Sequence, residues 1–177
     1  MFGGCDAMVH VIKLDKGREE KAIESSDPIA ASATADGGRV YVGSMGSQFL
    51  CFDVKLGKMI WQYEDRPFNY ESSPALTRKL VLFGGQDKRL HCLDREDGSV
   101  KWVFNTKGQV NSSPVVCGNR VLVGSNDGKL YMVSLDKGKK VWEFETGDAV
   151  TASPAVAGGK VVIGSEDGFV YCFGSRK

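Results

Sequence analysis

The sequence has no long apolar run and no excess of charge of one sign. Its 23 basic and 22 acidic residues give a formal net charge of +1 and are spread along the whole chain. Nucleic-acid and membrane surfaces need basic residues gathered on one face, and a membrane-spanning helix needs about 18–20 consecutive apolar residues. We therefore expect no nucleic-acid partner and no membrane span. Residues 1–20 also lack the charged, apolar and small-residue regions of a signal peptide.

Cysteine is scarce, and its spacing matches neither a disulfide framework nor a zinc site. The five cysteines are Cys5, Cys51, Cys92, Cys117 and Cys172. Their number is odd and no Cys-x-x-Cys pair occurs. Three of them, Cys51, Cys92 and Cys172, recur at one position of an internal repeat, where stacked sheets would hold them about 10 Å apart. We expect small buried thiols and no disulfide.

What the chain does contain is a repeat of about 40 residues. Trp61, Trp102 and Trp142 are separated by 41 and 40 residues. Each copy reads as four short strands joined by glycine-rich turns, and no window shows an apolar stripe of helical period. A four-strand unit of this period is typical of a β-propeller blade. We predict an all-β fold, a β-propeller built from four-stranded antiparallel blades of about 40 residues.

The copies divide the single predicted domain, residues 1–177, into three complete blades and two partial ones. The complete blades are 29–64, 70–105 and 111–145. The partial first copy, 1–24, lacks a first strand and has Lys21 in place of tryptophan, so it is expected to have lost its anchor. The partial last copy, 151–173, lacks a fourth strand. Three arrangements are open: the strand near Arg18 to Glu24 completes the last blade, the chain is an open arc of a larger ring, or a homodimer completes a larger ring. We favour the homodimer, because an open arc leaves unpaired strand edges.

The recurring residues of the fourth strand and its turn have a structural interpretation. A tryptophan on each outer strand offers a flat surface of roughly 150–250 Å² to the neighbouring blade. Glycine permits the chain reversal before that strand, and an aspartate at the start of the turn accepts backbone hydrogen bonds. The predicted docking residues are Trp61, Trp102, Trp142, Gly57, Gly98, Gly138, Asp53 and Asp94.

These segments resemble a known family. Cys51-Phe-Asp53-x3-Gly57-Lys58-x2-Trp61 and its two later copies are similar to the tryptophan-docking repeat of pyrroloquinoline-quinone (PQQ)-like propellers, as are the flanking Val-Gly-Ser-x-Asp-Gly and Ser-Ser-Pro elements. The resemblance covers nearly the whole chain. It implies an eight-bladed propeller in most members, and the family includes quinone-dependent dehydrogenases as well as non-enzymatic, BamB-like proteins. It also implies the bacterial periplasm or envelope, and it brings PQQ and calcium into question as cofactors.

No pattern in the chain supports catalysis. A calcium site needs several carboxylate and amide oxygens, whereas Asp87, Asp127 and Asp167 are repeated turn residues that hairpin geometry explains. The vicinal cysteine pair that the resemblance associates with quinone enzymes is missing. His10 and His91 occupy a position that carries tyrosine in other copies, which favours packing. We predict no catalytic, cofactor-binding or metal-binding residue.

The predicted function is a non-catalytic scaffold that presents loops, the channel mouth or an edge strand to a protein or peptide. Phe68 and Tyr70 are the anchor-like residues of the loops that vary between copies, and Glu71, Asn111 and Thr151 share a repeat position near the channel mouth. The alternatives are a PQQ-binding oxidoreductase or a fragment of one, and an excised half-propeller with no activity of its own.

Overall fold

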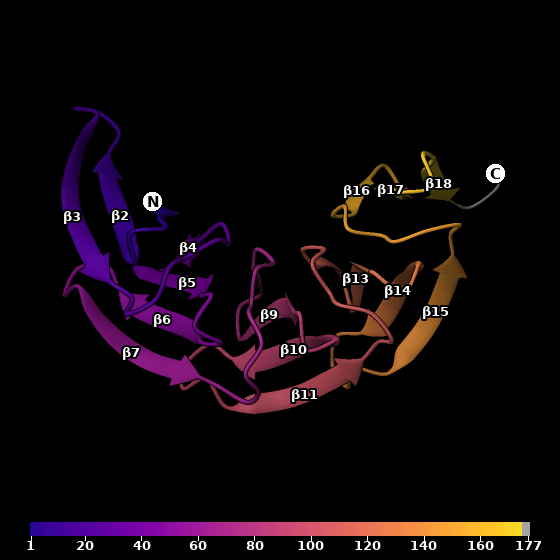
Figure 1. Ribbon diagram of the computed structural model, residues 1–177, viewed down its shortest axis with the longest axis horizontal. Coiled ribbons are helices and arrows are strands. Elements are labelled where there is room, and N and C mark those ends of the chain that lie inside the picture. The colour runs from indigo at the N-terminus through magenta and orange to yellow at the C-terminus, as the bar shows by residue number, and fades with distance from the viewer. Residues whose placement is uncertain (175–177) are drawn as a thin grey trace.

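A computed structural model describes residues 1–174, which form 18 strands and no helix. The strands make five antiparallel sheets arranged along an open arc, from the indigo first sheet to the yellow last sheet (Figure 1). This confirms the predicted all-β propeller architecture of repeated blades. The two ends of the arc do not meet in this single chain. Nowhere in residues 1–174 is there a helix with the length and apolarity needed to cross a membrane.

Three of the sheets have four strands each, paired in sequence order. The first of these contains β4 (Thr34–Asp36), β5 (Arg39–Gly43), β6 (Phe49–Asp53) and β7 (Lys58–Tyr63). The next contains β8 (Ala75–Leu76), β9 (Leu80–Gly85), β10 (Arg89–Asp94) and β11 (Val100–Asn105). The third contains β12 (Val115–Cys117), β13 (Arg120–Ser125), β14 (Lys129–Ser134) and β15 (Lys140–Glu145).

The sheets at the two ends of the arc have three strands each. The first contains β1 (Phe2–Gly3), β2 (Met8–Lys13) and β3 (Arg18–Glu24), and the last contains β16 (Ala155–Ala157), β17 (Lys160–Gly164) and β18 (Val170–Gly174). The suggestion that the strand near Arg18 to Glu24 completes the last blade is wrong for this chain. β3 pairs with β2, and its Ile23 packs with Val9 into the core against the second sheet.

The core lies between neighbouring sheets. Because side chains alternate between the faces of a strand, Val40 and Val42 of β5 pack toward the sheet of β1–β3, while Tyr41 packs toward the sheet of β8–β11. Both faces of an inner blade are therefore buried, and its strands have few exposed apolar positions. An end blade has only one covered face.

The fourth strand pairs with the third in the same register in every blade that has one. Trp61, Trp102 and Trp142 lie opposite Cys51, Cys92 and Met132, and a register shift follows each pair. The first sheet repeats this arrangement with Lys21 opposite Val11. The strands β7, β11 and β15, and β3, which occupies the same repeat position in the three-stranded first sheet, run along the outer rim of the arc (Figure 1).

Candidate functional site

Each inner tryptophan is held by a turn of the following sheet. The indole Nε1 of Trp61 donates a hydrogen bond to the carbonyl oxygen of Arg95 (3.1 Å), and Trp102 donates to Leu135 in the same way (2.8 Å). The Trp61 ring lies so close to Gly98 that a Cβ built there would be 2.8 Å from the ring atom Cε3. Trp61 and Trp102 are consequently only 8% and 9% exposed.

The turn that receives the tryptophan is built by glycine and aspartate. Gly98 has a φ of +74°, a conformation that residues with a Cβ rarely adopt, and its N–H donates to the Asp94 carbonyl (3.0 Å). The Asp94 carboxylate accepts from the N–H of Glu96 (2.9 Å). Equivalent turns are formed around Gly57 with Asp53 and around Gly138.

The first blade keeps its anchor in a different form. Lys21 replaces tryptophan, yet its Nζ donates to the carbonyl oxygens of Val54 (3.3 Å) and Lys55 (2.6 Å), in the turn that corresponds to the Arg95 turn. Its aliphatic stem lies against Gly57. A lysine stem can cover apolar surface while its ammonium reaches a polar group, so the expectation of a lost anchor was wrong.

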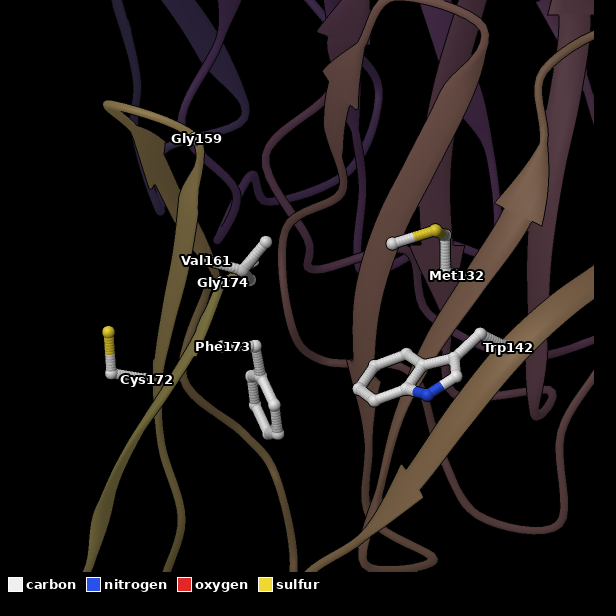
Figure 2. A pocket seen from close by; sticks show the side chains of 7 residues that line it. All are labelled: Met132, Trp142, Gly159, Val161, Cys172, Phe173 and Gly174. Atoms are coloured by element: carbon white, nitrogen blue, oxygen red, sulfur yellow. The ribbon is translucent and has the colours of Figure 1, made fainter. Parts of the chain in front are cut away.

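Trp142 has no docking turn among residues 1–174. Its exposed fraction is 36%, and its Nε1 makes no hydrogen bond to any residue from 1 to 174. A cavity of about 580 Å³ opens between β15 and the last sheet. In Figure 2, Val161 and Phe173 face Trp142 and Met132 across this cavity, while Cys172 points to the other side of its strand.

The far side of the last sheet is also uncovered. Val162 and Val170 are 38% and 74% exposed, whereas Leu122 and Leu130, their counterparts one blade earlier, are 2% and 0% exposed. No strand of the described residues pairs with the outer edge of β18. We refer to the Trp142 cavity, this edge and the face around Val170 as the open end. The sequence analysis had named an edge strand as one possible interaction surface, but it singled out no residue of this sheet other than Thr151.

The two loop residues predicted as anchors differ in accessibility. Phe68 is 42% exposed. Tyr70 is fully buried, so its prediction as an interaction residue was wrong. The Tyr70 ring packs edge-on against Phe83 (5.1 Å between centroids) and fills the space beside Gly85. The absence of a Cβ at Gly85 makes room for the ring in the core.

The three channel-mouth residues do not form one site. Thr151 Oγ1 hydrogen-bonds to the Glu166 carboxylate (3.0 Å), and Glu71 accepts from the Asn69 amide (3.3 Å). Asn111 Oδ1 is buried without a partner in the described residues. No hydrogen bond within residues 1–174 joins any two of Glu71, Asn111 and Thr151.

The repeated turn aspartates have a second role beyond hairpin geometry. Each contacts the side chain four positions later: the Tyr131 hydroxyl donates to the Asp127 carboxylate (2.8 Å) and the Tyr171 hydroxyl donates to the Asp167 carboxylate (2.7 Å). Asp127 also accepts from the backbone N–H of Lys107 in the preceding blade (2.8 Å). The recurring Asp-x3-His/Tyr spacing was the sequence signal for this contact.

The acidic, histidine and cysteine side chains of residues 1–174 are dispersed. These residues contain no group of three or more His, Cys, Asp or Glu side chains placed to hold a metal ion. The thiols of Cys51 and Cys92 are buried, and burial raises the pKa of Cys51 to about 11. Cys5, Cys117 and Cys172 are exposed, contrary to the expectation of buried thiols, and among the described residues no further sheet covers Cys172.

Comparison with known proteins identifies the family to which this fold belongs. A sequence profile of the family described as outer membrane protein assembly factor BamB matches residues 69–176. The chain belongs to this family. The resemblance to PQQ-like repeat propellers is thereby confirmed. No curated protein matches the chain significantly.

Solved structures support the same fold. BamB from Moraxella catarrhalis superposes with a TM-score of 0.83 at 15% identity, covering 98% of this chain and 60% of that one. The computationally designed protein Ika8 gives 0.85 at 18% identity over 97% of this chain and 54% of its own. The designed Ika4 gives 0.74 at 17% identity, over 83% of this chain and 91% of its own. The chain thus spans between half and two thirds of the length of the first two of these structures.

Proposed function

We propose that this BamB-family chain is a non-catalytic binding scaffold of the bacterial envelope, which holds a protein partner at its open end and uses neither PQQ nor calcium. The observation that carries the proposal is the apolar surface of the last sheet. Val170 and Phe169 are 74% and 66% exposed, beside an edge of β18 that no strand of residues 1–174 pairs with. Exposed apolar patches next to an open edge are typical of protein interaction sites.

Site-specific photocrosslinking tests this role. With a photoreactive residue at Val170 and the chain exported to the periplasm of a Gram-negative bacterium, we expect a discrete adduct with a component of the outer membrane protein assembly machinery. Leu56 is the matched control, because it is similarly exposed (65%) but lies in a turn away from the open end. Equal labelling from both positions, or adducts with unrelated proteins alone, would contradict the proposal.

A titration with PQQ and calcium separates the scaffold from the oxidoreductase alternative. We expect no saturable change in tryptophan fluorescence, because residues 1–174 contain no cluster of three or more acidic, histidine or cysteine side chains placed to hold calcium, and Asp127 and Asp167 are already hydrogen-bonded to tyrosine hydroxyls. Free tryptophan in the same titration corrects for light absorbed by the quinone. Saturable quenching at micromolar quinone would favour the oxidoreductase alternative.

A further inference from the structure

A polar cavity lies between the sheet of β4–β7 and the sheet of β8–β11, in the interior of the arc. Its volume is about 330 Å³, which is at the small end of the range for small-molecule sites. We propose that this cavity binds a small carboxylic acid as its monoanion, and that Arg78 pairs with the carboxylate. The site is separate from the open end, so the inference does not rest on the proposed function. The charged and aromatic residues that line the cavity are Asp36, Arg39, Tyr41, Arg78, Arg95 and Glu96.

The cavity lies where the chain departs from its own repeat. Arg95 occupies the turn position that carries Val54 one blade earlier and Leu135 one blade later. Tyr41 occupies the strand position of Leu82. Leu82 and Leu135 pack in one apolar cluster between the sheets of β8–β11 and β12–β15. At the cavity a polar pair takes their place, because the Arg95 guanidinium lies over the Tyr41 ring (5.3 Å to its centroid) and its Nε donates to the Tyr41 hydroxyl (3.2 Å).

Arg78 departs from the repeat as well, since it stands where other blades have glycine. Gly37 and Gly118 occupy this turn position with φ of +61° and +57°, whereas φ is not positive at Arg78. The turn is closed instead by the Thr77 hydroxyl, which accepts from the N–H of Leu80 (2.9 Å). Arg78 is exposed, and the arginine ion pairs within residues 1–174 do not include it. The rebuilt turn therefore places an unpaired guanidinium at the cavity.

The other two guanidinium groups are held in position by both sheets. Arg95 donates from Nη1 to the Thr77 carbonyl (2.6 Å) and from Nη2 to the Asp36 carboxylate (2.9 Å). Arg39 donates from Nη1 to the Arg95 carbonyl (3.0 Å) and from Nη2 to the Glu96 carboxylate (2.9 Å). The side chains of Asp36 and Glu96 are 64% and 76% exposed, whereas those of Arg95 and Arg39 are 10% and 28% exposed. Solvent and salt screen the exposed acids more than the less exposed arginines, so the interior of the cavity favours an anion.

The charges of the lining favour a carboxylate over a phosphate. Three guanidinium cations and two carboxylates leave one positive charge, which a monoanion neutralises and a dianion exceeds. A guanidinium presents two parallel N–H groups that match the two oxygens of a carboxylate. Arg95 and Arg39 already use several N–H groups within the protein. Arg78 is therefore the group that can hold the ligand in this paired geometry.

N-acetylalanine is the probe, and its uncharged methyl ester is the matched control. Added to the ¹⁵N-labelled protein, the acid is expected to shift the side-chain Nε–H signals of Arg78 and Arg95 saturably, and the ester is expected to leave them in place. Arg78→Ala should weaken binding about tenfold or more, because a hydrogen bond to a charged group is lost. Lys79→Ala removes the next cation of the same turn, which does not line the cavity, and should bind as the parent does. Arg95→Leu restores the apolar residue of the repeat and should abolish binding in a protein that still folds.

Four results would overturn the proposal. The first is a folded protein whose arginine signals do not respond to the acid, and the second is equal binding of the methyl ester. The third is an equal loss of binding in Arg78→Ala and Lys79→Ala, which would show that the general surface charge attracts the acid. The fourth is tighter binding of inorganic phosphate than of N-acetylalanine, which would identify a site for a dianion.

Discussion

Trp61→Ala is expected to lower the free energy of unfolding by about 3–5 kcal/mol, the range for removing a large aromatic side chain from a core. The substitution empties the space between β7 and the Gly98 turn and leaves the Arg95 carbonyl without its indole donor. It also removes ring contacts to Phe49 and Tyr41. Urea unfolding followed by far-UV circular dichroism measures the loss, because that signal does not depend on the deleted fluorophore.

Trp142→Ala is the matched control within the same chain. The residue type, strand position and register are the same, but the indole is 36% exposed rather than 8% and has no docking turn among residues 1–174. We therefore expect less than half the destabilisation of Trp61→Ala. Equal losses from both substitutions would show that stability depends on packing within a blade and not on docking between blades.

The period of the sequence was enough to predict the architecture. A tryptophan, a turn glycine and four short strands recurring every 40 or 41 residues admit few arrangements, because a single four-stranded meander cannot bury both its faces alone. The structure places Trp61 and Trp102 on the glycines of the next blade. Repetition made these residues visible: any one of them alone would have been an ordinary apolar or turn residue.

Features that depend on departures from the repeat could not be predicted in the same way. Tyr70 looked like a loop anchor, but its ring reaches the core because Gly85 leaves room for it. Lys21 looked like a lost anchor, but a long cation reaches the same turn carbonyls as an indole does. Cys172 shares a repeat position with buried thiols, and its exposure is decided by the absence of a neighbour. Each depends on three-dimensional surroundings that one repeat does not encode.

The second large effect is expected at Asp87, whose side chain is fully buried between β9 and β10. Its carboxylate accepts from Nε of Arg89 (2.6 Å) and from the His91 ring (3.1 Å), and His91 also contacts the Tyr63 hydroxyl (3.2 Å). Asp87→Ala leaves the buried Arg89 with Asp65 as its remaining partner. Removing one member of a buried ion pair costs about 3–5 kcal/mol, which urea unfolding at neutral pH would measure.

The equivalent substitution in the last blade is the control for Asp87→Ala. Asp167 occupies the same repeat position and accepts from Tyr171 and from the Gly147 N–H, but no arginine pairs with it among the described residues. Asp167→Ala should therefore destabilise the protein less than Asp87→Ala. A loss as large at Asp167 would mean that the ring hydrogen bond, and not the buried ion pair, is the source of the stability.

The same aspartate predicts a specific response to acid. Burial raises the pKa of Asp87, but the hydrogen bond from His91 and the charges of His91 and Arg89 outweigh it, so the pKa lies below the usual value. A carboxyl whose pKa is lower in the folded state adds stability above its unfolded pKa of about 4, and this stability is lost as the pH falls through the folded value. The free energy of unfolding should therefore drop below about pH 4, and Asp87→Asn should make that drop shallower.

Because other acids of the chain also have lowered pKa values, the informative quantity is the difference in the free energy of unfolding between parent and variant at each pH. A difference that stays constant from pH 7 to pH 3 would show that the Asp87 charge contributes nothing to folding.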